Sequence, residues 1–134
     1  MTLEILALCD AATVSEGKLN ILGAFDSLHT TQLPVAHPQC AIALRLRFAR
    51  IEEGEHRLKI NVVDEDGRSI MPPLEGAMAV KFGADDESAV ANFVINIHQL
   101  KFEQAGQYSI DLAVDGRHET SLPLFVKTRA PAAA

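Results

Sequence analysis

The sequence predicts an antiparallel all-β sandwich of about eight strands in a single domain. Apolar and polar residues alternate with a period of two along most of the chain, which is the pattern of half-buried strands. Short runs rich in Gly, Asp and Glu separate the alternating segments, as tight hairpins require. With 134 residues, the chain has the length of one domain that can hold a core without disulfides.

The alternating segments define the strands in order. In residues 41–49, four apolar side chains share one face: Ile42, Leu44, Leu46 and Phe48. The same alternation recurs in 58–62, 93–97, 108–114 and 122–126. Strands are therefore expected near residues 3–13, 18–30, 40–50, 56–64, 68–82, 89–99, 107–115 and 118–127. One helical turn is expected near residues 85–89, where acidic residues suit a helix N-terminus.

Prolines mark the longer connections. Pro34 and Pro38 indicate a connection that changes sheets, whereas Pro72 and Pro73 place their segment on an edge or at a break in a strand. The domain is expected to span residues 1–128, and residues 129–134, which have no pattern, are expected to form a disordered tail.

Residues 102–110 narrow the fold, because they read F-x-x-x-G-x-Y-x-I between two alternating segments. This stretch resembles the corner before the sixth strand of immunoglobulin-like sandwiches, where a Tyr hydroxyl bonds to upstream backbone. The resemblance implies structural roles for Gly106 and Tyr108, with the Tyr108 hydroxyl bonded to backbone in residues 102–105. Ile110 stands where antibody domains have their second Cys, so a sandwich without a disulfide is expected.

The N-terminal half carries a second resemblance. Residues 8–12 read L-C-D-A-A and residues 17–26 read G-K-L-N-I-L-G-A-F-D. These segments, with the D-E-D-G turn at 64–67 and the G-x-Y corner, are similar to a family of small uncharacterised bacterial β-sandwich proteins. The resemblance implies a fold and assigns no site residues.

Composition excludes several classes of partner and location. A net charge of −6 argues against a nucleic-acid backbone or an anionic membrane as partner, since both attract clustered Lys and Arg. No segment has the form of a signal peptide or a membrane span. Cys9 and Cys40 are too few for a disulfide framework, so two free thiols and a cytoplasmic location in a bacterial cell are expected.

No residue set in the sequence points to catalysis, and no catalytic or cofactor-binding residue is assigned. The candidates for a metal site are His29, His37 and Cys40, which surround one connection but lack a second ligand pair for zinc. Asp64-x-Asp66-Gly67 resembles a calcium loop, but hairpin-turn chemistry explains it better. Asp10 has two interpretations, a buried carboxylate paired with Lys18 or a turn residue bonded to its own backbone.

These observations favour a non-enzymatic protein-interaction or assembly module, either a homo-oligomer or a subunit bound to another protein. The alternative is a small-molecule or zinc-binding protein. The first interpretation depends on surplus apolar surface, because the first strand is apolar on both faces and Val94 lies on an otherwise polar face. The expected interface residues are Leu6, Leu8 and Phe125.

Overall fold

The computed structural model describes residues 1–130 and shows an all-β protein with two sheets and two free cysteines. The strands are β1 Thr2–Ser15, β2 Lys18–Ala24, β3 Ser27–Thr30, β4 Val35–Ala49, β5 Gly54–Val63, β6 Leu74–Val80, β7 Ser88–Phe102, β8 Gly106–Val114 and β9 Arg117–Thr128. A single 3-10 turn, Arg50–Glu52, joins β4 to β5. The predicted all-β sandwich arrangement is thus present, with nine strands.

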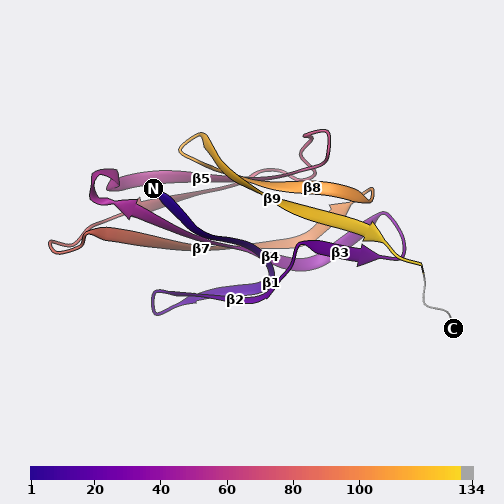
Figure 1. Ribbon diagram of the computed structural model, residues 1–134, viewed down its shortest axis with the longest axis horizontal. Coiled ribbons are helices and arrows are strands. Elements are labelled where there is room, and N and C mark those ends of the chain that lie inside the picture. Colours follow the sequence, from indigo (N-terminus) through magenta and orange to yellow (C-terminus); the bar gives the residue numbers. More distant parts are fainter. Residues whose placement is uncertain (131–134) are drawn as a thin grey trace.

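The two sheets lie one above the other (Figure 1). The first sheet has the order β2-β1-β4-β7, and every pair in it is antiparallel. The second sheet has the order β3-β9-β8-β5-β6, in which β3 pairs parallel with β9 and the other pairs are antiparallel. The connection from β3 to β4 changes sheets, as Pro34 predicts, and contains a cis peptide bond before Pro34. Pro38, also expected in this connection, lies inside β4.

The core lies between the sheets, and β4 supplies its centre. The four residues whose alternation predicts this strand are all at most 1% exposed: Ile42, Leu44, Leu46 and Phe48. From the opposite sheet, β5, β8 and β9 contribute Ile60, Leu112 and Leu124, each at most 1% exposed. Burial of these side chains provides the main driving force for packing the two sheets together.

The predicted strand at residues 18–30 is two strands in different sheets, and this is the main correction to the predicted strand order. β2 pairs with β1 through a two-residue turn in which Glu16 and Gly17 both have positive φ, the geometry of a type I′ hairpin. The chain then bends at Gly23, which also has a positive φ, and at Asp26. It continues as β3, whose only strand partner in residues 1–130 is β9.

The hairpin of β1 and β2 forms a partial third layer below the first sheet (Figure 1). Residues 2–9 of β1 pair with β4, whereas residues 9–15 pair with β2. The hairpin buries small residues on the outer face of the sheet, since Cys9, Ala41 and Ala43 are each 0% exposed. Partly buried side chains pack around these three residues from the hairpin and from β7, namely Ala12, Leu19 and Val94. The chain therefore covers Val94 with its own hairpin.

The helical turn predicted near residues 85–89 is absent. The Gly83 N–H donates to the Asp86 carboxylate at 2.8 Å, and the Asp86 N–H donates to the Gly83 carbonyl at 3.3 Å. Arg50 holds the same loop by donating to the Asp86 carbonyl at 2.6 Å, and Ser88 already belongs to β7. The acidic residues therefore serve a turn, not a helix N-terminus.

The Tyr108 corner is present as predicted. The Tyr108 hydroxyl donates to the Gln104 carbonyl at 2.6 Å, and the ring packs edge-on against Phe102 at 4.9 Å between centroids. Gly106 has φ +149°, and a Cβ there would lie 2.7 Å from a Glu65 carboxylate oxygen. That oxygen accepts a hydrogen bond from the Gln107 N–H at 2.8 Å. The D-E-D-G turn thus fits against the corner, and a side chain at Gly106 would displace the Glu65 carboxylate from its contact with Gln107.

The C-terminal end of the described chain is held by a backbone contact. The Arg129 N–H donates to the Thr30 carbonyl at 2.8 Å, which extends the pairing of β3 with β9. Of the tail predicted to be disordered, residues 131–134 lie outside the described residues. Within residues 1–130, no helix has the length and apolar character needed to cross a membrane.

Candidate functional site

Strand β7 lies at one edge of the first sheet, and its outer edge has no strand partner in residues 1–130. It pairs with β4 from Ser88 opposite Ala49 to Phe102 opposite Val35. The unpaired edge presents a row of backbone N–H and C=O groups that can accept another strand, and it is irregular at Gln99, which has a positive φ. From Ser88 to Leu100 the sequence contains no Lys, Arg, Asp, Glu, Pro or Gly. This edge therefore lacks the residues with which proteins usually prevent strand addition.

The strands at the other sheet edges are shorter or carry such protective residues. β2 has seven residues, begins at Lys18 and bends at Gly23. β3 has four residues. β6 has seven residues, follows Pro72 and Pro73, and carries an exposed Glu75. Short length, charge and proline all discourage edge-to-edge pairing. The contrast makes β7 the edge best suited to pairing.

The two faces of β7 differ in chemistry. Toward the core it presents Phe93, Ile95 and Ile97, of which the first two are only half-buried although they point between the sheets. On the outer face it presents Asn92, Val94 and Asn96, of which Asn96 is exposed. Partial exposure of core-facing residues is what an edge strand shows when no neighbouring strand lies beside it.

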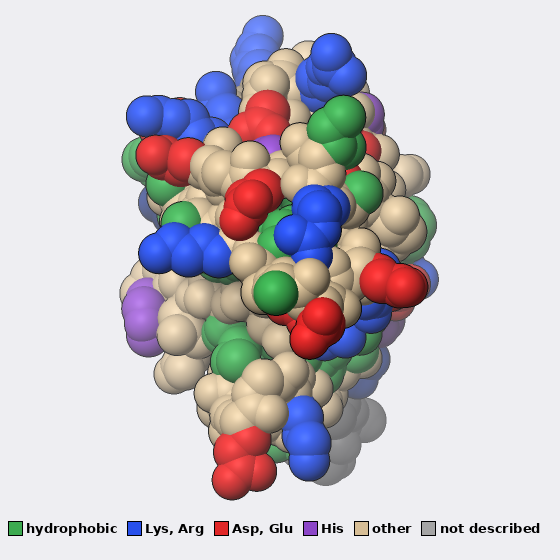
Figure 2. All heavy atoms as spheres, turned by 90° about the vertical axis from the view of Figure 1, so that its left-hand side faces the viewer, with side chains coloured by type: hydrophobic (Ala, Val, Ile, Leu, Met, Phe, Trp, Pro, Cys, Tyr) green, Lys and Arg blue, Asp and Glu red, His purple; other side chains and the backbone are tan. Residues whose placement is uncertain are grey.

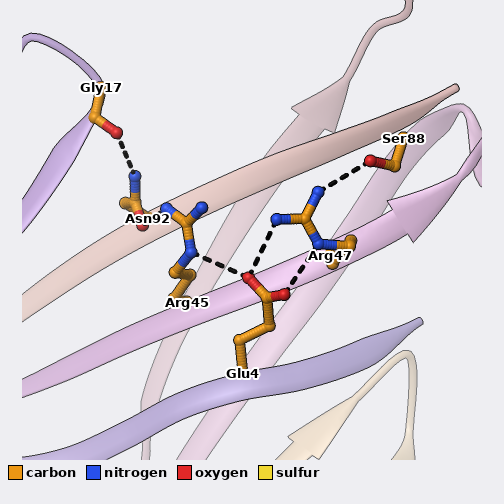
Figure 3. A network of polar contacts seen from close by, with 6 residues as sticks. All are labelled: Glu4, Gly17, Arg45, Arg47, Ser88 and Asn92. Carbon is orange, nitrogen blue, oxygen red and sulfur yellow. Dashed lines mark hydrogen bonds and ion pairs between the residues drawn. The ribbon is translucent and has the colours of Figure 1, made fainter. Parts of the chain in front are cut away.

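Asn92 joins β7 to the turn of the β1–β2 hairpin (Figure 3). Its side-chain amide donates to the Gly17 carbonyl at 3.1 Å, and its side-chain oxygen accepts from Arg45 at 3.2 Å. The hairpin is thereby fastened at its tip to the outer face of the edge strand. The hairpin also carries three exposed hydrophobic residues: Val14, Ile21 and Leu22, at 46%, 37% and 70% exposure.

Glu4 organises the two arginines on the same face (Figure 3). Arg45 Nε and Arg47 Nε each donate to one of its carboxylate oxygens at 2.8 Å, and Arg47 also donates to the Ser88 hydroxyl at 2.7 Å. Hydrogen bonds from Arg47 and then Arg45 lower the pKa of Glu4. Arg45 and Arg47 therefore belong to a network that spans β1, β4 and β7, while Arg50 lies apart and binds the loop before β7.

The end of the molecule on the left of Figure 1 is viewed directly in Figure 2. Side chains of both signs are interspersed over the described part of this face, and hydrophobic side chains lie between them in small separate groups (Figure 2). Ile51, 94% exposed, is a single residue in the 3-10 turn between β4 and β5. Isolated exposed hydrophobic residues of this kind are ordinary on protein surfaces.

A polar cluster at the β8–β9 turn was not found from the sequence. His56 Nδ1 lies 2.6 Å from an Asp115 carboxylate oxygen, and Nε2 lies 2.5 Å from the Glu52 carbonyl. Both nitrogens face acceptors, so the ring makes both contacts only as the doubly protonated imidazolium. The bond to Asp115, followed by the bond to the Glu52 carbonyl, raises the pKa of His56. The ring also stacks on Phe48 at 4.7 Å between centroids, so the cluster fastens β5 to the β8–β9 turn.

The structure corrects the expected interface of Leu6 and Leu8. Both residues point into the core, where Leu8 is 4% exposed and Leu6 is partly buried. Alternation separates the two faces of β1 correctly, but both faces are apolar, and the one bearing Leu6 and Leu8 turns inward. These residues line a pocket of about 400 Å³ together with Phe25, Leu122 and Pro123. Leu8 is thus unavailable to a partner.

Phe125 points to the outer face of the second sheet, as expected, but it is half-buried. It pairs with Ser27 of β3 on one side and Gln107 of β8 on the other, and the Lys127 amine lies 5.8 Å from its ring centroid. Neighbouring strands and Lys127 therefore cover part of the Phe125 side chain, which was expected to contact a partner.

The three candidate metal ligands do not form one ligand set. His29 is exposed in β3, His37 lies against Phe25 in β4, and Cys40 is 1% exposed in the core. His37 Nε2 is buried without a hydrogen-bond partner in the described residues. No group of three His, Cys, Asp or Glu side chains in residues 1–130 is placed to hold a metal.

Both thiols are free and buried, as predicted for their redox state. Burial, followed by the neighbouring Cys9 and Asp10, raises the pKa of Cys40 to about 11. Burial also raises the pKa of Cys9, whose thiol lies 3.4 Å from the Ala41 carbonyl oxygen. Neither group has the lowered pKa of a nucleophilic cysteine.

Asp10 packs against the backbone of Gly23, where a Cβ would clash with the Asp10 carboxylate. Asp10 and Gly23 face each other across the hairpin, on the side where the chain bends toward β3. No ion pair between Asp10 and Lys18 is present in residues 1–130. The spacing of Asp10 and Gly23 in the N-terminal pattern thus has a steric reason.

A shallow groove of about 680 Å³ crosses the outer face of β5, β6 and β8. Its small residues are Gly76, Ala77 and Ala113, and Arg57, Lys59, Glu75 and His118 also line it. The groove is open, and its charged side chains are exposed. Small ligands usually bind in concave and mostly apolar sites, so this groove is a weaker candidate than the edge of β7.

Comparison with known protein families gives one relevant match. The model of a family of unknown function, DUF6941, matches residues 4–127. No curated protein matches the chain in sequence.

Two solved structures resemble the fold. A β-glucosidase from Listeria innocua, in complex with isofagomine, is similar over 96% of this chain and 17% of its own, with a TM-score of 0.51 and 11% identity. The alkylpurine DNA glycosylase AlkC from Pseudomonas fluorescens, bound to DNA containing an abasic site analog, is similar over 91% of this chain and 30% of its own, with a TM-score of 0.43 and 9% identity. The chain spans less than a third of either protein. At 11% identity, the similarity to the β-glucosidase concerns the fold alone and says nothing about activity.

Proposed function

This chain belongs to the DUF6941 family, and we propose that it is a non-enzymatic assembly module that binds another protein chain by strand pairing along β7. The observation that carries the proposal is the open edge of β7, uncharged from Ser88 to Leu100. Strand addition at a sheet edge gives affinity through main-chain hydrogen bonds, and side chains on alternate positions give specificity. A partner strand would also cover the half-buried Phe93 and Ile95.

The ionisable groups support a structural role over a catalytic one. Glu4 has a lowered pKa and is bound by two arginines, and His56 has a raised pKa and is held between two acceptors. Each shift comes from fixed contacts that join strands. Catalytic groups with shifted pKa values typically face a cleft in which substrate can bind.

The finer architecture is part of the same proposal. The arrangement of the two sheets is compatible with an immunoglobulin-like sandwich: β1, β4 and β7 face β9, β8 and β5, and β3 is parallel to β9. The Tyr108 corner also supports this architecture. In this scheme β2 belongs to an added hairpin. A cytoplasmic location in a bacterial cell remains a prediction.

The experiment places a photoreactive amino acid at Asn96, on the open edge, and at Gln107, an exposed position in the middle of the second sheet. We expect illumination in the expressing cell to give adducts of defined protein mass from position 96 and none from position 107. Introducing Val90→Lys into the first variant should abolish the adducts, because a charge on an edge opposes strand addition. Equal adducts from both positions, or none from position 96, would contradict the proposal.

A second candidate function, small-molecule binding, is favoured by the groove lined by Arg57, Lys59 and His118. Arg57 and Lys59, which lie beside Glu75, could attract a small anion into the open groove. A panel of carboxylates and phosphates should then raise the unfolding temperature of the parent chain and not of Lys59→Glu. Equal shifts in both chains would eliminate this groove as the binding site.

A further inference from the structure

We propose that the strand added to β7 is β7 of a second copy, antiparallel about a two-fold axis beside Val94. The two four-stranded sheets would then form one continuous eight-stranded sheet. The inference rests on the proposed function, since it names the partner for the same edge. Two-fold dimers are the commonest protein assemblies, and their interfaces must be self-complementary.

The sequence of β7 is self-complementary in chemical type. Residues 92–96 read Asn-Phe-Val-Ile-Asn, with an amide at each end, large apolar residues next to the centre, and Val94 in the middle. Reversing this segment, as an antiparallel two-fold partner does, places amide opposite amide and apolar side chain opposite apolar side chain. Ala91 then meets Ile97, and Val90 meets His98, so no ionic conflict arises over nine residues. A strand of unrelated sequence would not require this symmetry.

The faces of β7 agree with this register. Phe93 would pair with Ile95 of the second copy on the core side, where both residues are half-buried in a single chain. Pairs of aromatic and β-branched residues are among the favourable cross-strand pairs. On the outer side, Val94 would meet Val94 of the second copy. Asn92 would meet the second copy's Asn96, which is exposed in the single chain.

The register has an electrostatic consequence. The Asn92 oxygen already accepts a hydrogen bond from Arg45, so the second copy's Asn96 would come to lie beside a guanidinium. A positive charge at position 96 should therefore oppose dimer formation, and a negative charge should be tolerated or favourable. The difference between the effects of a positive and a negative charge at position 96 is specific to this register. A general disturbance of the edge would weaken the dimer equally with either charge.

The first test is disulfide cross-linking by mild oxidation of variants in which one residue of β7 is replaced by cysteine. Val94→Cys places two thiols directly opposite each other, where Cα atoms in antiparallel strands are about 4.5–5.5 Å apart and a disulfide can form. Asn96→Cys is the matched control, because its two copies lie four residues apart along the paired strands. We expect a covalent dimer from Val94→Cys and none from Asn96→Cys, with Cys9 and Cys40 buried and unreactive. The reverse pattern, or equal yields, would overturn the register.

The second test leaves Val94 and its packing untouched. Analytical ultracentrifugation should show a dimer for the parent chain at about 100 µM. Asn96→Lys should raise the dimer Kd at least about tenfold, since it introduces two repulsive contacts across the two-fold axis. Asn96→Asp should leave Kd within about threefold or lower it. As controls, Gln107→Lys and Gln107→Asp in the second sheet should leave Kd unchanged.

The outcomes separate this inference from the proposed function. A parent chain that is monomeric at this concentration, with no disulfide from Val94→Cys, would overturn pairing with a second copy. In that case, photo-adducts from position 96 with a different protein would still support strand pairing along β7. Equal weakening of the dimer by Asn96→Lys and Asn96→Asp would overturn the register about Val94.

Discussion

Replacing Tyr108 with Phe tests the corner of the second sheet with the removal of one oxygen atom. The hydroxyl donates to the Gln104 carbonyl at 2.6 Å, and the Tyr108 side chain that carries it is 5% exposed, so the hydrogen bond is partly buried. The aromatic contact with Phe102 is retained in the variant, so the change isolates the hydrogen bond. Breaking a hydrogen bond and leaving a shielded acceptor without a donor costs about 1–3 kcal/mol.

The surroundings of Gln104 place the expected loss in the lower part of that range. Gln104 is an exposed residue in the β7–β8 loop, so its carbonyl can regain a water molecule when the hydroxyl is lost. We expect Tyr108→Phe to lower the free energy of unfolding by about 1–1.5 kcal/mol. Tyr108→Leu, which also removes the ring contact with Phe102, should cost about 2–4 kcal/mol.

Urea unfolding followed by circular dichroism measures both values. The midpoint of Tyr108→Phe should fall while the m-value stays the same, because the folded and unfolded surfaces hardly change. Ser27→Ala is a control that removes an exposed hydroxyl whose bond to Asp26 joins adjacent residues, and it should have little effect. A midpoint for Tyr108→Phe equal to that of the parent chain would refute the stabilising role of the corner.

Three further predictions concern other contacts. The pKa of His56 is raised in the folded chain and that of Asp115 is lowered, so their pair should stabilise the fold above the unfolded pKa of Asp115 and below that of His56. This contribution should disappear as the pH rises through the folded pKa of His56. The difference in unfolding free energy between the parent chain and His56→Gln, measured by urea unfolding from pH 5 to 9, should therefore shrink as the pH rises. A difference that stays constant over this pH range would refute the linkage. Gly23→Ala should lower the free energy of unfolding by about 1–3 kcal/mol, because position 23 has a positive φ and lies close to Asp10. In a double-mutant cycle, adding Asp10→Ala should recover part of this loss. Strictly additive effects of the two substitutions would show that the residues are not in contact. Thiol titration at neutral pH should detect almost no reaction of Cys9 and Cys40 in the native chain and two thiols after unfolding, and rapid labelling of native Cys40 would contradict its burial and its pKa of about 11.

Local patterns predicted the parts of this fold that local physics determines. Alternation in residues 41–49 identified the inward face of β4, because side chains in a strand alternate regardless of the rest of the fold. The G-x-Y spacing predicted the Tyr108 hydrogen bond, since donor and acceptor are four residues apart. Gly17 and Gly116 marked two tight hairpins through the positive φ that such turns need.

The remaining features depend on which strands become neighbours. Leu6 and Leu8 were placed on the wrong side of β1, because alternation separates two faces without telling which one is inside when both are apolar. The single strand predicted at 18–30 divides because β3 is held by β9, at the far end of the chain.

The candidate site illustrates the same limit. The absence of charge in residues 88–100 can be read from the sequence, but the position of β7 at an edge follows from the sheet order. The contact of His56 with Asp115 joins residues fifty-nine positions apart, and no local pattern indicates it. Regular spacing therefore predicts which faces of the strands are buried, whereas the candidate site depends on sheet order and on contacts between distant residues.

The parallel pairing of β3 with β9 imposes an order on folding. β3 ends at Thr30 and β9 ends at Thr128. β3 is therefore synthesised early but cannot pair until the last residues of the described chain have been made. A nascent chain can close the β1–β2 hairpin by local contacts while β3 still lacks its partner. Contacts this distant in sequence slow folding and prolong the time in which unpaired strands are exposed. A chain released before β9 is complete would leave β3 without a partner and β8 paired with β5 alone, and such truncated products should be the ones most dependent on chaperones and proteases.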